Sequence, residues 1–333
     1  MPSGRVPLRG LPFLAGASHS DVPLSIPLVQ GIALDCPDAA ANAESLALSC
    51  GPTIEAHVQE TGVLLLRRTP LRDRATFQTF LDGLGYSVHG YEGGIAVRTR
   101  EPGSVLVAST EDCRVTMAPH NEMAYLPNAP GKVFFLCVQA AESGGEVPIN
   151  DIRETVSAID ERVLSRFERE GIRYHRYLPR HSTATQIGWE ETFGLHARDM
   201  VDDLLRRVKG YEVTWLADEG LSYAYVFDAF KVDPRTGGNL WFNQVTELHC
   251  SYWRAHPLFP SDLPDERYPA TTAWGSGEPI DVDLISRLRA ALWRNAKAVA
   301  MRPGDVLVLD NTYIQHGRFA FTGPRAHFVS LTQ

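Results

Sequence analysis

Residues 118–123 (APHNEM) carry the side chains of a candidate metal site. In an extended segment alternate side chains lie on the same face, so His120 and Glu122 would project toward one point and offer an imidazole nitrogen and a carboxylate oxygen. A third ligand is available near the C-terminus at His316, just after a predicted strand. Two histidines and one carboxylate leave three coordination positions open, as expected for non-haem iron(II) that binds a cosubstrate together with dioxygen. The sequence therefore predicts an iron(II) site at these three residues.

A basic residue beside such a metal site could bind the cosubstrate if that cosubstrate is a dicarboxylate. Residues 319–325 (FAFTGPR) predict a strand, a Thr-Gly-Pro turn and a second strand that begins with Arg325. A guanidinium can hold the distal carboxylate through paired hydrogen bonds while the 2-oxo-carboxylate end chelates the metal. Arg325 is the first candidate for this role and Arg318 competes with it. The alternative for Arg325 is a solvated charge in a hairpin.

With these residues in place, the sequence resembles the iron(II)- and 2-oxoglutarate-dependent dioxygenases of the taurine dioxygenase and clavaminate synthase superfamily. Within that superfamily it is similar to the group of the syringomycin-pathway aspartyl hydroxylase. The resemblance runs from about residue 117 to the end of the chain, with a weaker match upstream. Its motifs are residues 119–123 (PHNEM), 132–137 (KVFFLC), 143–149 (SGGEVPI), 151–153 (DIR), 240–244 (LWFNQ), 304–311 (GDVLVLDN), 316–318 (HGR) and Arg325.

The resemblance implies a double-stranded β-helix, or jelly roll, with iron held by His120, Glu122 and His316 and 2-oxoglutarate held by Arg325. It also implies hydroxylation of an unactivated C–H bond with dioxygen. The substrate class is a small amino acid or a natural-product intermediate, free or tethered to a carrier protein, in secondary metabolism such as antibiotic biosynthesis. Diversion of the hydroxylation to desaturation or cyclisation stays open.

One position departs from the family pattern. The segment after the Gly-Gly pair commonly reads G-G-x-T, and its threonine hydroxyl helps to bind the distal carboxylate of 2-oxoglutarate. This chain has Val147 there, which cannot donate a hydrogen bond. Weaker cosubstrate binding, a substitute donor and a shifted pose are the three possible consequences. Glu122 in place of aspartate is within the family's range, and it argues against the related halogenases, which have a small residue there.

Other polar residues near these motifs are candidates for supporting roles. Asn121, Asn311 and Gln315 are expected to fix the tautomers of the histidine rings. The candidate substrate contacts are Arg114, Gln139, Asn243 and His327. Trp241 and Phe242 are by default core residues.

The elements that must position these residues are mostly short strands. Hydrophobic periodicity predicts helices over residues 72–84, 152–170, 197–209 and 283–299, and strands over 62–66, 104–108, 133–139, 222–227, 239–242, 305–309 and 326–332. This order favours a mainly β jelly roll with helical insertions. Residues 1–333 are expected to form a single domain in which residues 1–20 are a flexible N-terminal extension.

Composition narrows the class of protein. With 32 basic and 40 acidic side chains the net charge is −8, which argues against a nucleic-acid-binding protein. No apolar run approaches the roughly 18 residues that span a bilayer. Five cysteines without a C-x-x-C pair indicate neither a disulfide framework nor a zinc knuckle, so a cytoplasmic location is expected. Residues 11–17 resemble a signal peptide only faintly because Pro12 interrupts them.

Two other functions are kept as alternatives. One is a zinc hydrolase that uses His175 with His181, or His249 with His256, although neither pair has the H-E-x-x-H form. The other is a catalytically idle jelly roll that binds a ligand, an alternative to which Val147 gives some weight.

Overall fold

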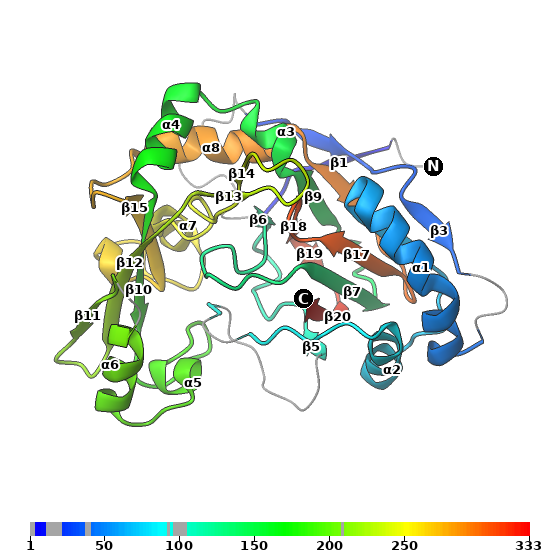
Figure 1. Ribbon diagram of the computed structural model, residues 1–333, viewed down its shortest axis with the longest axis horizontal. Coiled ribbons are helices and arrows are strands. Elements are labelled where there is room, and N and C mark those ends of the chain that lie inside the picture. Colours follow the sequence, from blue (N-terminus) through cyan, green and yellow to red (C-terminus); the bar gives the residue numbers. More distant parts are fainter. Residues whose placement is uncertain (1–3, 11–21, 37–40, 92–93, 96–104, 208–209) are drawn as a thin grey trace.

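The structure is a computed structural model that describes residues 4–10, 22–36, 41–91, 94–95, 105–207 and 210–333. Figure 1 shows a mainly β molecule with helices at its periphery. This confirms the prediction of a mainly β fold with helical insertions. In the described part of the chain, no helix is both long and apolar enough to cross a membrane.

Two sheets build the part of the molecule that carries the predicted motifs. The strand order of the six-stranded sheet is β3 (Ala33–Asp35), β4 (Val63–Arg67), β17 (Val306–Asp310), β7 (Lys132–Gln139), β20 (Ala326–Thr332) and β5 (Val105–Val107). The order of the four-stranded sheet is β16 (Lys297–Val299), β9 (Val147–Asp151), β18 (Ile314–Arg318) and β6 (Met117–His120). All pairings are antiparallel except that of β3 with β4.

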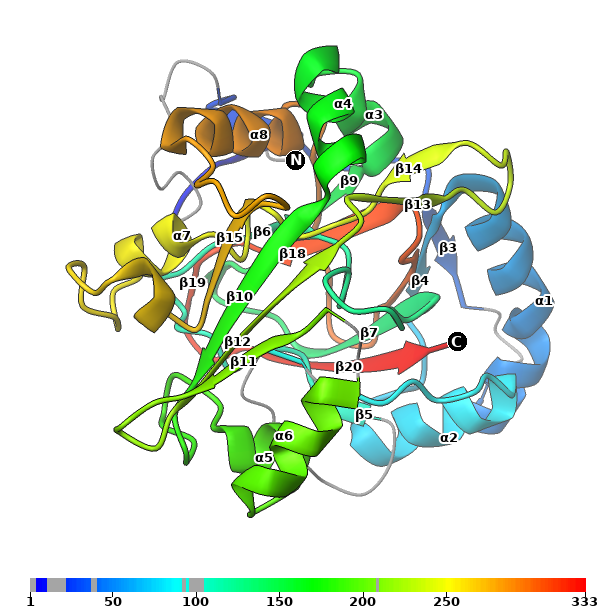
Figure 2. The same ribbon diagram turned by 60° about the vertical axis from the view of Figure 1, so that its left-hand side comes forward.

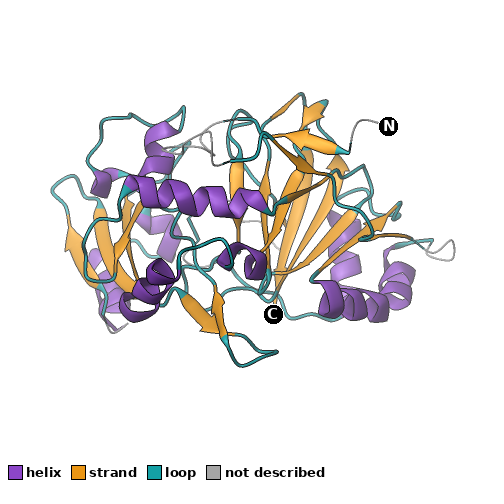
Figure 3. Ribbon diagram, turned by 90° about the horizontal axis from the view of Figure 1, so that it is seen from above, coloured by secondary structure: helices purple, strands orange, loops and turns teal. Residues whose placement is uncertain are grey.

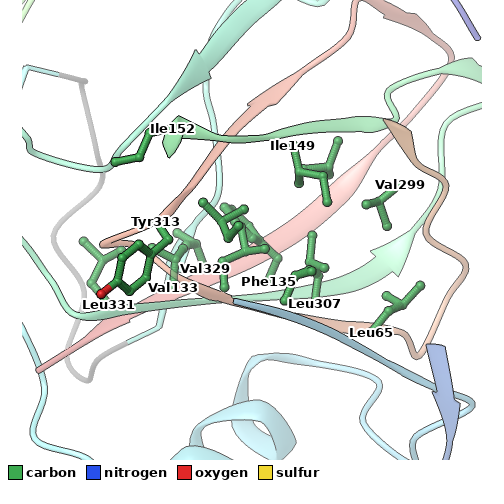
Figure 4. Close-up of a cluster of buried hydrophobic side chains, with 14 of the residues drawn as sticks. Leu65, Val133, Phe135, Ile149, Ile152, Val299, Leu307, Tyr313, Val329 and Leu331 are labelled. Atoms are coloured by element: carbon green, nitrogen blue, oxygen red, sulfur yellow. The ribbon is translucent and has the colours of Figure 1, made fainter. Parts of the chain in front are cut away.

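The two sheets face each other across a shared hydrophobic core. Figure 4 shows Ile149 and Val299 of the four-stranded sheet opposite Leu65, Phe135 and Leu307 of the six-stranded sheet. Alternate residues of the six-stranded sheet point away from this core. They are apolar as well, because the second face of the sheet is also buried. Burying one such aliphatic side chain stabilises the fold by roughly 1.5–3 kcal/mol.

The outer face of the six-stranded sheet is covered by helices α1 (Ala43–Thr61) and α2 (Arg74–Leu84). Figure 2 places α1 beside β3 and β4 and α2 near β5. Helix α2 agrees with the prediction for residues 72–84. Helix α1 was missed because Pro52 interrupts its helical pattern, yet packing against the sheet keeps the chain helical around this proline.

A third sheet lies to the left of the first two in Figure 1, and Figure 3 shows its strands as a separate group. Its strand order is β11 (Glu212–Trp215), β12 (Leu221–Phe227), β10 (Ile172–Leu178) and β15 (Ala270–Trp274). The other helices are α3 (Ile152–Val156), α4 (Glu161–Glu170), α5 (Trp189–Phe193), α6 (Arg198–Arg207), α7 (Cys250–Ala255) and α8 (Val282–Arg294), with the short 3₁₀ helix η2 (Asp265–Arg267). Of these, α3 contacts β9 and α8 contacts β6 of the four-stranded sheet. Short strand pairs are formed by β1 (Arg5–Pro7) with β2 (Ser25–Pro27), β13 (Phe230–Val232) with β14 (Asn239–Trp241), and β8 (Ser143–Gly144) with β19 (Phe321–Thr322).

Several predicted boundaries differ from the structure. The helix predicted over residues 152–170 is split into α3 and α4, because Asp160 caps a new helix by accepting a hydrogen bond from the Arg162 N–H. The helix predicted over 283–299 ends at Arg294, and residues 297–299 pair with β9 as a strand instead. The strands before and after the Thr-Gly-Pro turn exist, but β19 pairs with β8 while β20 pairs with β7 and β5, so they do not form a hairpin.

Part of the predicted N-terminal extension lies outside the described residues. Within residues 4–10, β1 pairs with β2, and the backbone carbonyl of Arg9 accepts a hydrogen bond from the Thr116 hydroxyl. Residues 208–209, at the end of the helix predicted over 197–209, and residue 104, at the start of a predicted strand, also lie outside the described residues.

Candidate active site

His120, Glu122 and His316 come together where β6 and β18 meet. His120 ends β6, and the register of the two strands places it directly opposite His316. One ligand atom from each of the three side chains lies within 4.8 Å of the others, and His316 Nε2 is 3.4 Å from Glu122 Oε2. Gly317 permits this close approach of the strands, because a Cβ there would lie 2.2 Å from the carbonyl oxygen of Met117.

The protonation of His120 is set by the backbone. Its Nδ1 lies 2.8 Å from the carbonyl oxygen of Ala118, which can only accept, so Nδ1 carries the proton and Nε2 has a free lone pair. Burial lowers the pKa of His120, and the nearby His316 lowers it further. A neutral imidazole with an exposed lone pair is the form that binds a metal. One nitrogen from each of the two histidines and one carboxylate oxygen form a donor set that fits an iron(II) ion.

The amides predicted to support the site act mainly through the backbone. Asn311 accepts a hydrogen bond from the Glu122 N–H at 2.7 Å and donates one to the Glu122 carbonyl at 3.0 Å. Asn121 donates to the Asn311 carbonyl, while Gln315 accepts from Asn150. The contacts of Asn311 and Asn121 fix the turn that carries Glu122. None of these hydrogen bonds reaches a histidine ring: Nδ1 of His120 contacts the Ala118 carbonyl, and Nδ1 of His316 has no partner among the described residues.

A pocket of about 190 Å³ opens over the three side chains. His120, Glu122 and His316 lie in its wall together with Val147, Arg318 and Arg325. Much of the remaining surface is aromatic and is formed by Tyr91, Tyr125, Phe135, Tyr252, Trp253 and Phe259. A small, partly aromatic pocket with a few convergent polar groups is typical of a small-molecule site.

Arg325 is a buried cation in this wall. Its Nη2 lies 2.9 Å from Nδ1 of His327, and its Nε has no hydrogen-bond partner in the described part of the chain. Burial and then the charge of Arg318 lower the pKa of Arg325 to about 10, and none of the carboxylates that the structure describes pairs with it. Gly145 leaves room for its side chain, since a Cβ there would lie 3.1 Å from Cδ and Nε of Arg325. A buried guanidinium without a counter-charge is suited to an anionic ligand.

The hydrogen bonds of Arg318 exclude it from the same role. Its Nη1 donates to the carbonyl of Glu111 and contacts the Ser109 hydroxyl, and its Nη2 donates to the carbonyls of Asp112 and Val115. The N–H groups on both terminal nitrogens are thereby used. Arg318 thus holds the turn over residues 109–115 in place beside the pocket.

The predicted substrate contacts lie in different places. His327 is buried, but it contacts Arg325 and is not among the residues that line the pocket. Arg114 is 63% exposed and pairs with Asp112, and Gln139 is exposed at the end of β7. Asn243 is buried and donates to the Ala229 carbonyl. These three also do not line the pocket, because nearness in sequence to a motif does not determine the direction of a side chain.

Sequence reasoning missed the polar side of the pocket. This side is formed by Glu111, Gln244, Glu247, Tyr252 and His256. Glu111 lies far from the other four in the sequence. Gln244 belongs to the motif at residues 240–244, which was the available signal. The other four lie in no recognised motif.

The histidine pairs considered for zinc do not form a site. His175 contacts the Ser222 hydroxyl, and His181 lies near Glu190. His249 caps α7, and His256 binds Glu111. Among the described residues, the group of three side chains able to hold a metal is His120, Glu122 and His316.

The chain is similar to one described family and to two known proteins. A model of the family described as "Taurine catabolism dioxygenase TauD, TfdA family" matches residues 38–332. The chain is 28% identical over 280 residues to the dapdiamide synthesis protein DdaC of Enterobacter agglomerans, covering 84% of each chain. It is 27% identical over 286 residues to a clavaminate synthase-like protein of Arabidopsis thaliana, covering 84% of this chain and 83% of that one.

A solved structure supports the fold. The similarity is to PvcB of Pseudomonas aeruginosa, described as an iron- and α-ketoglutarate-dependent oxygenase from an isonitrile synthetic pathway. The TM-score is 0.51 at 16% sequence identity, over 95% of this chain and 92% of PvcB.

Proposed function

Because this chain belongs to the TauD and TfdA family of dioxygenases, we propose that it hydroxylates an unactivated C–H bond of a small amino-acid-like molecule. The enzyme depends on iron(II), 2-oxoglutarate and dioxygen. In this proposal His120, Glu122 and His316 hold the iron, and Arg325 holds the distal carboxylate of 2-oxoglutarate. The substrate is either free or tethered to a carrier protein.

The observation that carries the proposal is the placement of Arg325. It is a buried guanidinium without a carboxylate partner among the described residues, and it lines the same pocket as the three candidate metal ligands. A cation in this state is stabilised when an anion binds beside it. A dicarboxylate that reaches from the metal to Arg325 would supply that anion. The alternative of a solvated hairpin charge is not supported, since Arg325 is buried and β19 does not pair with β20.

When bound, iron(II) supplies the chemistry that activates dioxygen against 2-oxoglutarate and oxidises the substrate C–H bond. The protein's own residues position and protect these reactants. The Ala118 carbonyl holds the proton on Nδ1 of His120 and so keeps Nε2 available. Asn311 fixes the backbone of Glu122. His327 holds the guanidinium of Arg325, and the aromatic wall limits water near the reacting atoms.

We further propose that the two facing sheets are the walls of a double-stranded β-helix and that residues 1–333 form one domain. Support comes from the strand order, in which strands distant in sequence alternate, such as β9, β18 and β6 in one sheet and β17, β7 and β20 in the other. The shared core in Figure 4 binds the sheets together.

The proposed substrate class rests on the pocket and on one relative. A volume of about 190 Å³ suits a small molecule or the acyl end of a tethered one. The relative from Enterobacter agglomerans is named for dapdiamide synthesis, which supports a role in secondary metabolism such as antibiotic biosynthesis.

The first experiment measures succinate. The protein is loaded with iron(II) without oxygen and then mixed with 2-oxoglutarate, ascorbate and air, in the presence and absence of candidate amino acids. We expect slow succinate formation that a substrate accelerates, and loss of both iron and succinate formation in His316→Ala and Glu122→Ala. An iron-loaded protein that forms no succinate with any candidate would support the catalytically idle jelly roll. Stoichiometric zinc without iron-dependent turnover would support the zinc protein.

A further inference from the structure

A carboxylate that the proposed chemistry does not use lies in the wall of the pocket. Glu111 belongs to the turn over residues 109–115 that Arg318 holds in place. Its Oε1 accepts hydrogen bonds from Nε2 of His256 and from the Asp112 N–H, each at 2.8 Å. Its Oε2 lies 3.4 Å from the Tyr252 hydroxyl. Because a carboxylate has about four acceptor positions, Oε2 can accept a further donor from the pocket.

His256 does not neutralise this carboxylate. Its Nδ1 accepts a hydrogen bond from the Leu258 N–H at 3.1 Å, so Nδ1 carries no proton. The single ring proton is therefore on Nε2, which donates to Glu111. A neutral histidine orients Glu111 and leaves the negative charge in place.

Arg318 does not form an ion pair with the Glu111 side chain either. The hydrogen atoms on its two terminal nitrogens point at the Ser109 hydroxyl and at three backbone carbonyls, of which one is that of Glu111 itself. Arg318 stabilises the charge of Glu111 from a distance. Burial raises the pKa of Glu111, whereas the hydrogen bonds from His256 and from the Asp112 N–H and the charge of Arg318 lower it.

The other carboxyl groups in the pocket wall differ from Glu111 in their partners or in their pKa. Asp112 is paired with the exposed Arg114. Burial raises the pKa of Glu247, whose Oε1 accepts from the Thr246 hydroxyl at 2.6 Å. Glu122 faces His316 in the candidate metal site. Glu111 is thus the ionised pocket carboxylate that is assigned neither to a metal nor to an arginine side chain.

Tyr252 and His256 contact this carboxylate, and two further aromatic rings pack against them. Tyr252 packs edge-on against Trp253 with ring centroids 4.8 Å apart, and Phe259 packs edge-on against both Trp253 and His256. All four of these side chains line the pocket. An ionised carboxylate beside aromatic faces attracts a cation through charge and ring quadrupole together.

We propose that Glu111 is a specificity-determining residue that binds the ammonium group of the substrate, so that the substrate is an amine with a free, positively charged amino group. This inference rests on the proposed function, because it concerns the same pocket. His256 and Arg318 are positioning residues in it, since the first orients the carboxylate and the second holds its backbone.

The test compares amines with their acylated counterparts on the complete enzyme. The probes are the carboxamides of the common L-amino acids, and each is paired with its N-acetylated form. They are added, in the absence of oxygen, to the protein loaded with iron(II) and 2-oxoglutarate. Binding is followed by the visible absorption of that complex, and succinate is measured after air is admitted. We expect one or more amines to bind and to accelerate succinate formation, and acetylation to weaken that binding about 10- to 100-fold, the effect of losing a charge-assisted hydrogen bond.

Two variants of the same turn sharpen the test. Glu111→Gln keeps the shape and removes the charge, and we expect it to raise the apparent KM for the amine about 10- to 100-fold while the affinity for the acetylated form stays the same. Asp112→Asn is the matched control, because it removes one negative charge from the same turn at a residue already paired with Arg114. We expect it to leave the preference for amines unchanged.

The possible failures are distinguishable. If the wild-type protein forms succinate but no amine binds, or if acetylated probes bind as well as amines, the role of Glu111 is wrong and the proposed function stands. The same holds if Glu111→Gln binds amine and acetylated probes with wild-type affinities. If the iron-loaded wild-type protein forms no succinate at all, the proposed function fails and this inference fails with it.

Discussion

The guanidinium of Arg325 donates a hydrogen bond from Nη2 to Nδ1 of His327 at 2.9 Å. Arg325 immediately precedes β20 and His327 is its second residue, with an irregularity in the register between Ala326 and His327. Since Nδ1 accepts, it is unprotonated, and burial together with the charges of Arg325 and Arg318 lowers the pKa of His327 to about 2. The pair consists of a cation and a neutral acceptor, which orients the arginine without cancelling its charge.

This pairing predicts that His327 acts through Arg325. His327→Phe keeps a ring of similar size and removes the acceptor, so the guanidinium should lose its fixed orientation. We expect the KM for 2-oxoglutarate to rise about tenfold, the effect of one hydrogen bond to a charged group, with a smaller change in kcat. His327→Asn offers an oxygen acceptor and should recover part of the loss. An unchanged KM in His327→Phe would show that Arg325 is held in other ways.

Replacement of Arg325 itself should have the larger effect. Arg325→Met removes the cation that the distal carboxylate is expected to contact, and the KM for 2-oxoglutarate should rise by about 100-fold or more. Arg325→Lys keeps a charge without paired hydrogen bonds and should lie between this variant and the wild type. Arg114→Met is the control, because this exposed arginine lies outside the pocket wall. Steady-state kinetics in 2-oxoglutarate measure all three, and equal values for Arg325→Met and wild type would contradict the assignment.

At Val147 a substitution can add a hydrogen-bond donor to the pocket instead of removing one. It lines the pocket with Arg325, but its side chain cannot donate a hydrogen bond. Val147→Thr introduces a hydroxyl of nearly the same volume, and we expect the KM for 2-oxoglutarate to fall about fivefold, corresponding to roughly 1 kcal/mol. Val147→Ala changes the volume without adding a donor and should not lower the KM. If Val147→Thr raises the KM instead, the cosubstrate is bound in a pose that leaves no room for the hydroxyl.

The pKa of His327 also predicts a dependence of stability on pH. Between about pH 2 and 6.5 the unfolded chain binds a proton at this histidine while the folded protein does not, so the free energy of unfolding rises with pH across that window. Well inside the window this single group contributes a slope of about 1.4 kcal/mol per pH unit. Urea unfolding of the metal-free protein between about pH 5 and 8 measures it. The slope of His327→Phe below about pH 6 should be smaller by that amount, and an equal slope would place the titration elsewhere.

Much of the candidate site was predictable because it depends on local geometry. His120 ends β6, whereas Glu122 lies in the turn that follows and not in the extended segment expected. The residue types and their spacing, with His316 after an apolar strand, were still sufficient to propose the three ligands. Most of the core strands were predictable for the same reason, since runs such as residues 133–139 and 305–309 are apolar over a strand's length. Helix α1 was not, because contacts with the sheet outweigh the effect of Pro52.

The sequence by itself thus determined the types of donor atom, their chain positions and the mainly β class of the fold. Only the tertiary structure favours Arg325 over Arg318 for the proposed contact with 2-oxoglutarate, because the hydrogen bonds of Arg318 go to the turn at residues 109–115, which is distant in sequence. It also brought Glu111 to His256 across 145 residues of chain. Which hydrogen bonds a polar side chain makes depends on what packs beside it, and residues that pack together in this fold are mostly far apart in sequence.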